Sequence, residues 1–165
     1  EAYGPDRFAR DLAAAGGAGT ITPDLPPDDC PEWFEATDRH GLDRVFLIAP
    51  SSSQERIGLT MRSCRGWVYA TSVMGVTGAR ASTSDAAPVI VERARGVDPS
   101  LPVGVGLGVS NGAQAAEIGA FADLVIVGSA LLKCLGSDGR DLDGDLRRLR
   151  LLVDDLASGV DCART

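Results

Sequence analysis

Along this chain, uninterrupted apolar runs alternate with segments that have the spacing of amphipathic helices. The apolar runs cover residues 19–26, 43–50, 66–72, 101–108 and 122–128. Runs of this kind are typical of strands buried on both faces. A helix after each strand indicates right-handed βαβ units in a parallel sheet. The predicted class is therefore α/β, either an open doubly wound sheet or part of a (β/α)8 barrel.

The helices are expected between these strands, with recognisable starts and stops. A Pro at the first turn and a Gly past the end delimit the segment 31–41, and the Ser residues at 51–53 fit an N-cap. Ser110 is the expected cap of the helix over 110–121. The remaining helices are predicted over 5–15, 82–96, 128–135 and 145–160.

Composition excludes several classes of protein. Apolar residues make up 44% of the 165 residues, which fits a globular domain with its own core. A net charge of −7 without a basic segment argues against nucleic-acid binding. No apolar run is long enough for a membrane span, so we expect no membrane and a cytoplasmic location. The four cysteines form no Cys-x-x-Cys pair, which predicts free thiols and no metal site.

Two successive strands each end in a glycine turn that opens a helix. Gly106 and Gly108 follow the run at 101–108, and Gly128 and Ser129 follow the next strand. Glycine lets backbone N–H groups approach an anion closely, and a helix N-terminus adds a favourable dipole. The paired turns predict a phosphate cradle, although glycines also simply end strands. A dinucleotide fingerprint fits poorly, because Asn111 stands where the third glycine belongs.

The same survey finds few candidates for acid–base chemistry. Asp24 is the only carboxylate at a predicted strand end, and it also fits a turn between two prolines. Tyr69 either lines a pocket or packs, and His40 is expected to be a solvated residue at a helix end. Glycines and Arg80 in the loop 73–80 either form a mobile surface loop or add an N–H, from Gly78, to the cradle. The chain thus predicts a phosphate site without an acid–base pair.

Together these motifs resemble the tryptophan synthase alpha chain family over almost the whole chain. The similar segments are Ile-Thr-Pro-Asp-Leu-Pro-Pro-Asp-Asp at 21–29, the strand and helix at 41–57, Gly-Val-Thr-Gly-Ala-Arg at 75–80, and the two glycine turns. The resemblance implies strands four to eight of a (β/α)8 barrel, so residues 1–165 would be the C-terminal part of one barrel domain. The combination is far more specific than any single motif.

The resemblance also implies an activity, a retro-aldol cleavage of indole-3-glycerol phosphate to indole and glyceraldehyde 3-phosphate. It implies that the phosphate is held by Gly78, Gly106, Gly108 and Ser129, with Gly128 at the same turn. Tyr69 would line the substrate pocket and Thr77 would order the loop over it. Asp24 and Pro26 would belong to the loop that meets the beta chain in an alpha2beta2 complex. Pyridoxal phosphate belongs to that beta chain, and no cofactor is implied here.

The family's catalytic Glu and its Asp-bearing loop have no counterpart in these 165 residues. A whole barrel takes roughly 250 residues, so about five βα units are expected. We therefore expect no catalytic residue in this chain, poor stability and no cleavage when it is alone. A non-catalytic module that binds a sugar phosphate or docks on a beta chain remains an alternative. Another phosphate-binding barrel, related to epimerases or thiamine-phosphate synthase, fits the loop motifs less well.

Overall fold

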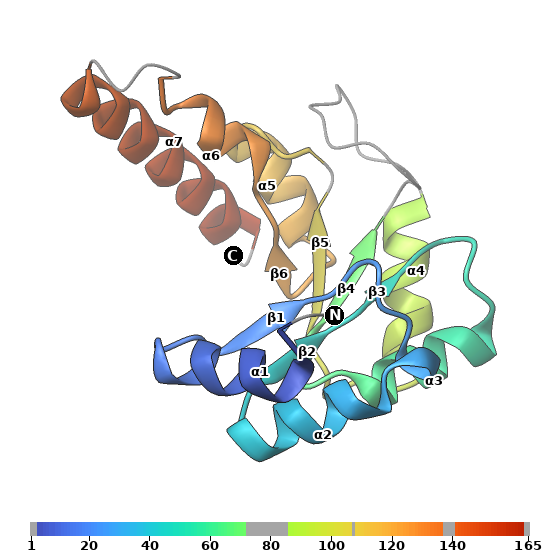
Figure 1. Ribbon diagram of the computed structural model, residues 1–165. Coiled ribbons are helices and arrows are strands. Elements are labelled where there is room, and N and C mark those ends of the chain that lie inside the picture. Colours follow the sequence, from blue (N-terminus) through green and yellow to red (C-terminus); the bar gives the residue numbers. More distant parts are fainter. Residues whose placement is uncertain (1–2, 72–85, 107, 137–140, 164–165) are drawn as a thin grey trace.

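The computed structural model describes residues 3–71, 86–106, 108–136 and 141–163. Helices and strands alternate along these segments, as the apolar runs predicted (Figure 1). In chain order the elements are α1 (Pro5–Ala14), β1 (Gly19–Ile21), the 3-10 turn η1 (Pro27–Asp29), α2 (Pro31–His40), β2 (Asp43–Val45), β3 (Leu47–Ile48), α3 (Gln54–Ser63), β4 (Val68–Thr71), α4 (Ala86–Arg95), β5 (Val103–Gly106), α5 (Gly112–Gly119), β6 (Leu124–Val125), α6 (Ser129–Lys133) and α7 (Leu142–Ala163).

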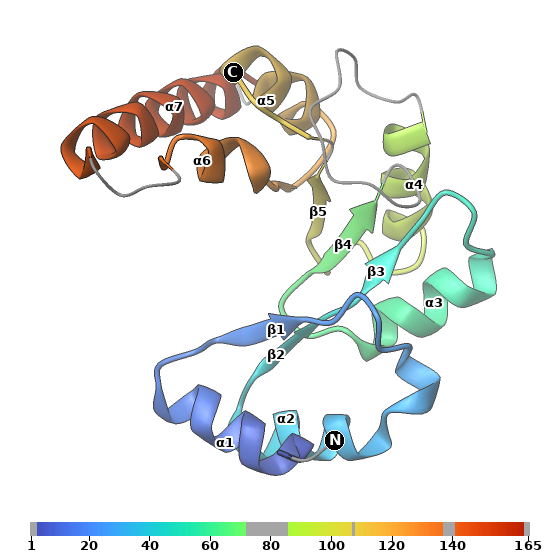
Figure 2. The same cartoon turned by 45° about the horizontal axis from the view of Figure 1, so that its top comes forward.

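Among the described residues all strand pairs are parallel, in a two-stranded sheet β1-β2 and a four-stranded sheet β3-β4-β5-β6. The strand order follows the chain order, which is the order of a barrel and not of a doubly wound sheet. The strands follow an arc with helices along its outside, and α1 and α7 lie at the two ends of this arc (Figures 1 and 2). The described strands therefore form an incomplete barrel.

The run at 43–50 is not one continuous strand, and that prediction was wrong. β2 pairs with β1, whereas β3 pairs with β4, and Phe46 lies between them in neither strand. The Phe46 side chain is buried against Phe34 of α2, with ring centroids 5.8 Å apart. The amide of Tyr69 still donates to the Phe46 carbonyl at 3.0 Å, so hydrogen bonding continues past the break. The run is thus divided where its pairing changes from β1 to β4.

The helix ends mostly follow the predicted capping residues. Pro31 occupies the first turn of α2, Gly41 ends it at φ 67°, and Ser53 caps α3 by accepting from the amide of Arg56. The expected cap at Ser110 was wrong, because the cap of α5 is Asn111. The Asn111 side chain accepts from the amide of Gln114 at 2.9 Å, and Ser110 instead donates to the Gln114 side chain.

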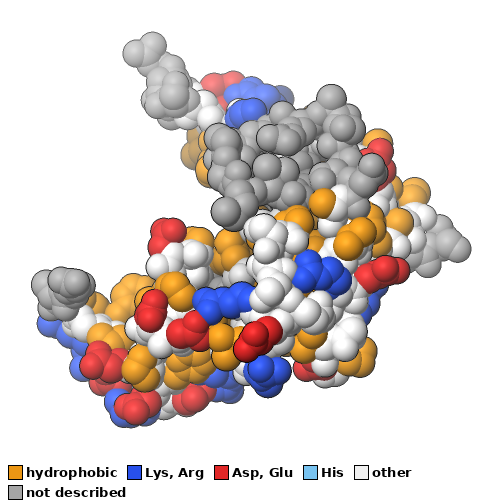
Figure 3. Space-filling view, turned by 90° about the vertical axis from the view of Figure 1, so that its right-hand side faces the viewer, with side chains coloured by type: hydrophobic (Ala, Val, Ile, Leu, Met, Phe, Trp, Pro, Cys, Tyr) orange, Lys and Arg blue, Asp and Glu red, His pale blue; other side chains and the backbone are white. Residues whose placement is uncertain are grey.

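The core lies between the strands and the outer helices. Val68 and Ala70 of β4 and Val103 and Val105 of β5 are fully buried on that side. Residues on the opposite face of the strands line the inner side of the arc, where Leu124 of β6 is still 40% exposed. On the outside, over α3 and α4, charged side chains of both signs are interspersed with hydrophobic ones (Figure 3). The inner face therefore keeps some apolar surface exposed.

Candidate active site

The carboxyl ends of β4, β5 and β6 meet at one edge of the four-stranded sheet. Thr71 at the end of β4 pairs with Gly106 at the end of β5, and Val125 of β6 pairs with Val105. In barrels with parallel strands, ligand sites lie at this edge. The structure thus brings the two predicted glycine turns next to each other, as a shared cradle requires.

The first turn contains a residue that only glycine fits readily. Gly108 has φ 68°, in the left-handed region that side chains disfavour. In the helix that follows it, the amide of the first residue, Gly112, also has a partner, because it donates to the Asp155 carboxylate of α7 at 2.6 Å. A carboxylate already accepts from the first amide of α5, so that amide is not available to an anion at this turn.

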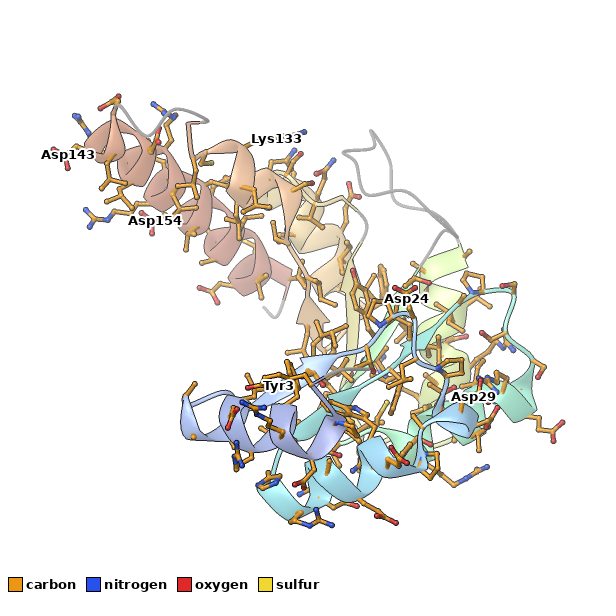
Figure 4. The ribbon with its side chains drawn as sticks, in the orientation of Figure 1. Tyr3, Asp24, Asp29, Lys133, Asp143 and Asp154 are labelled. Carbon is orange, nitrogen blue, oxygen red and sulfur yellow. The ribbon has the colours of Figure 1, made fainter. Side chains whose placement is uncertain are left out.

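The second turn is more open. Gly128 caps α6, its carbonyl accepts from the amide of Leu131 at 3.0 Å, and a Cβ added at Gly128 would meet no atom within 4 Å. The first amides of a helix have no acceptor within it, so those of Ser129 and Ala130 are available to a ligand. Lys133 lies at the other end of α6 (Figure 4). Gly128 and Ser129 thus offer backbone donors beside an uncrowded space.

Tyr69 faces the first glycine turn from the neighbouring strand. A Cβ built on Gly106 would lie 2.4 Å from the Tyr69 hydroxyl oxygen, so the ring passes directly over the glycine. Burial raises the pKa of the Tyr69 phenol. The hydroxyl is therefore protonated at neutral pH and able to donate a hydrogen bond to a ligand.

Two predicted substrate contacts, Thr77 and Gly78 in the loop 73–80, lie outside the described residues. Neither position can be compared with the glycine turns. Their assignment to the substrate stays a prediction.

Carboxylates are scarce at this edge of the described structure. Asp24 is exposed in the loop after β1 (Figure 4), as is Pro26, and none of the described residues at the ends of β4, β5 and β6 is acidic. His40 ends α2 with its side chain 20% exposed and Nε2 3.1 Å from an Asp6 carboxylate oxygen. The described part of the site offers backbone donors and a phenol and no acid–base pair.

Two features lie away from the strand ends. A cavity of about 480 Å³ lies between Pro5, Leu25 and residues 29–33. Cys30, Cys64 and Cys134 are free thiols, and Cys30 and Cys64 are buried. Within the described segments, no three His, Cys, Asp or Glu side chains gather as a metal site would require. No helix there has the length and apolar character needed to cross a bilayer.

Local sequence signals did not point to every residue near the glycine turns. Asp155 reaches Gly112 from 43 residues away, and nothing near it in the chain marks that contact. Trp67 lies close to Tyr69, with ring centroids 5.9 Å apart. The signal for this pair was present, since residues two apart on a strand face the same side.

A parallel arc of strands in chain order, outer helices and glycine turns at the carboxyl ends define the class as a (β/α)8 barrel, here incomplete. The family model described as the tryptophan synthase alpha chain matches residues 1–161. The chain belongs to the tryptophan synthase alpha chain family.

Individual relatives agree with this assignment. The alpha chain of Salinispora arenicola is 61% identical over 160 residues, covering 97% of this chain and 59% of that protein. The alpha chain of Mycobacterium avium is 58% identical over 158 residues, covering 96% and 56%. A structure of Mycobacterium tuberculosis tryptophan synthase superposes with a TM-score of 0.86 at 56% identity, covering 96% and 58%. The chain therefore spans less than two thirds of the length of these relatives.

A more distant structure shows the same fold. The tryptophan synthase a2b2 complex of the hyperthermophile Pyrococcus furiosus gives a TM-score of 0.82 at 32% identity, covering 94% of this chain and 62% of that chain. The backbone is thus preserved where most side chains differ, which fits a scaffold set by the pattern of strands and helices.

Proposed function

We propose that this chain supplies the phosphate cradle and part of the indole pocket of an indole-3-glycerol-phosphate lyase, which forms indole and glyceraldehyde 3-phosphate. The observation that carries the proposal is the pair of glycine turns on neighbouring parallel strands, with Tyr69 over the first of them. Membership of the alpha chain family supports the choice of substrate. The role of such an enzyme in tryptophan biosynthesis supports a cytoplasmic location.

The proposed division of labour follows from the chemistry of the step. A retro-aldol cleavage breaks the bond between the indole ring and the glycerol side chain. A base removes the proton of the neighbouring hydroxyl, and an acid protonates the ring carbon. The described residues at the strand ends supply neither group, so we infer that the phosphate cradle orients the substrate and that the acid and base come from outside this described part of the site. No cofactor takes part in the step.

Asp24 and Pro26 are proposed to belong to the surface that meets a beta chain. Both are exposed in the loop after β1. The similar P. furiosus structure is that of an a2b2 complex, which supports an equivalent assembly for the protein that carries this chain. Pyridoxal phosphate would be held by the beta chain. An Asp24→Lys variant should bind a beta chain more weakly in a titration by calorimetry, whereas an equal affinity would remove Asp24 from the interface.

The direct test is indole release from indole-3-glycerol phosphate by the full-length gene product and by the 165-residue chain, each with and without a beta chain. Release by the full-length product and none by the 165 residues is the expected result. Release by the 165 residues would mean that Asp24 or Tyr69 carries chemistry assigned here to other groups. No release by the full-length product would favour a non-catalytic module that binds a sugar phosphate or a beta chain.

The phosphate cradle has its own test at Gly128. A Cβ there meets no protein atom within 4 Å, so Gly128→Ala should fold normally. If the phosphate approaches this backbone closely, the methyl group displaces it. The KM of the full-length product then rises by about tenfold, the loss of one charge-assisted hydrogen bond. An unchanged KM would show that the phosphate lies elsewhere.

A further inference from the structure

β4 and the residue before it present two aromatic rings to the inner side of the barrel. Trp67 and Tyr69 are two residues apart, and their ring planes are tilted by 36° with centroids 5.9 Å apart. Val68 and Ala70, which alternate with them, are fully buried on the helix side. The two rings therefore stand on the face opposite the helix-side core.

β5 provides a glycine beneath each ring. A Cβ built on Gly104 would lie 2.7 Å from Cζ3 and 2.8 Å from Cε3 of Trp67, much closer than real Cβ contacts. The corresponding atom on Gly106 would lie 2.4 Å from the Tyr69 hydroxyl. Any side chain at either position would displace the ring above it. The two rings thus occupy the space that side chains at Gly104 and Gly106 would need.

Ile126 closes the same surface from the side of β6. Its Cδ1 atom is 3.0 Å from the added Cβ of Gly104, and its Cβ atom is 3.2 Å from that of Gly106. Leu124, directly beside Gly104 in the register, stays exposed on the same face. An apolar surface with two aromatic rings therefore lies just inside the edge that carries the glycine turns.

Depth distinguishes the two rings. Tyr69 lies over Gly106, the residue at the glycine turn, whereas Trp67 enters two residues earlier, about 6.6 Å deeper along the strand. A substrate held by its phosphate at the strand ends would place a flat apolar group farther inside. That group would pass Tyr69 first and reach the level of Trp67.

We propose that Trp67 is a specificity-determining residue that forms the bottom of the subsite for the aromatic ring of the substrate. We propose also that Gly104 is the residue that makes room for the Trp67 ring. This inference rests on the proposed function, since it takes indole-3-glycerol phosphate as the substrate. The indole ring of Trp67 sets the depth of the subsite. Residue 104 sets where that ring lies, because a side chain there drives it toward the ligand.

The experiment uses the full-length gene product and measures kcat/KM for indole-3-glycerol phosphate and for analogues with one methyl group on the benzo ring. Trp67→Phe puts a smaller ring at the bottom of the subsite and leaves room there for a methyl group. The ratio of kcat/KM for the best methylated analogue to that for the parent substrate should therefore rise roughly tenfold or more. The matched control is Trp33→Phe in α2, which should leave this ratio unchanged. Inhibition by inorganic phosphate should also stay within about twofold, because the cradle is untouched.

Gly104→Ala tests the second half of the proposal. Pushing the Trp67 ring into the subsite should lower kcat/KM for the parent substrate by about tenfold. The loss should disappear when Gly104→Ala is combined with Trp67→Phe, whose smaller ring leaves room for the methyl group. Thermal unfolding of each variant separates this steric effect from misfolding.

The outcomes are distinguishable. If the wild-type protein cleaves the substrate but Trp67→Phe leaves the analogue ratio unchanged, the inference about Trp67 is overturned and the proposed function stands. If Gly104→Ala leaves kcat/KM unchanged, or if the double variant is as impaired as the single one, Gly104 does not set the position of the Trp67 ring. If the wild-type protein does not cleave the substrate, the proposed function and this inference fall together.

Discussion

Arg44 is a buried cation in β2 whose guanidinium joins several elements. Its side chain is 8% exposed and donates to the Asp38 carboxylate at 2.6 Å and to the Thr37 hydroxyl at 2.8 Å. It also donates to the carbonyl oxygens of Phe34 and Ser63, and it lies 4.5 Å from the centre of the Phe34 ring. One side chain thus ties β2 to α2 and to the end of α3. A planar guanidinium suits such a site because its donors diverge in one plane.

Replacing Arg44 should therefore cost more than replacing its exposed neighbour. Arg44→Met leaves buried acceptors without donors, which lowers the free energy of unfolding by about 2 kcal/mol. Arg65 donates to the same carboxylate at 3.0 Å, but its side chain is 44% exposed, so Arg65→Met should cost well under about 1 kcal/mol. Urea unfolding of both variants checks this difference. An equal loss of unfolding free energy in the two variants would show that the burial of Arg44 does not determine its contribution to stability.

The same carboxylate predicts a pH dependence. The hydrogen bond from Arg44, followed by that from Arg65, holds the pKa of Asp38 below its ordinary value of 3.8. A carboxyl whose pKa is lower in the folded state stabilises the protein fully above the ordinary value. That contribution disappears as the pH falls through the folded-state pKa.

Asp38→Asn should lower the free energy of unfolding at neutral pH, and the difference from the wild type should shrink below pH 3.8. In an Arg44→Met background the difference should be smaller at every pH. Unfolding measured from neutral to acidic pH tests both statements. A difference that stays constant down to the most acidic pH would contradict the linkage to Asp38.

At the scale of elements, α5 and α7 pack with their backbones almost in contact. A Cβ added at Gly159 of α7 would lie 2.0 Å from the carbonyl oxygen of Gly112, and one added at Gly112 would lie 2.4 Å from the carbonyl oxygen of Asp155. The Asp155 carboxylate accepts from the Gly112 amide at the same point. Two glycines thus allow one helix to cap the other. This contact holds α5 in place behind the first glycine turn.

Gly159→Ala should destabilise the chain although alanine favours helices. The methyl group meets backbone atoms that cannot move independently, and the expected loss is about 2 kcal/mol. Gly58 of α3 provides the matched control, because a Cβ there meets only the flexible end of the Arg62 side chain, at 3.2 Å. Gly58→Ala should be neutral or stabilising by up to about 1 kcal/mol. If thermal unfolding shows the two variants to be alike, the close approach of α5 and α7 is not limiting.

At the scale of the whole molecule, the described barrel is open on its inner side and at two strand edges. β1 pairs only with β2, and β6 only with β5, among the described strands. Ile21 of β1 is 47% exposed and Leu124 of β6 is 40% exposed. Unpaired edges beside apolar surface favour pairing with another chain.

The 165-residue chain expressed by itself should therefore associate. We expect dimers or larger species in light scattering, and less association when Ile21 and Leu124 are both replaced by Lys. Lysine at exposed edge positions adds charge without disturbing the helix-side core. A monomer that unfolds cooperatively would contradict this expectation and indicate a self-sufficient arrangement of the strands.

Most elements could be predicted because their signals are local. Pro31 and Gly41 mark the ends of α2 within a dozen residues, and apolar runs mark β4, β5 and β6. The family motifs and the two glycine turns are also contiguous in the sequence. The break between β2 and β3 at Phe46 was missed because it depends on which neighbour each half of the run pairs with. Asn111 was missed because two adjacent residues, Ser110 and Asn111, both suit a cap.

By itself the sequence determined the α/β class and the glycine turns, since periodicity, capping and backbone freedom act between residues close in the chain. The resemblance of its contiguous motifs also indicated the family. Only the tertiary structure decided that Asp155 occupies the first amide of α5, that Arg44 joins three elements, and that Gly104 lies beneath Trp67. Each of these contacts joins residues whose proximity depends on how strands and helices pack. Such distances are set by close packing of the core and the register of the sheet, which no local pattern encodes.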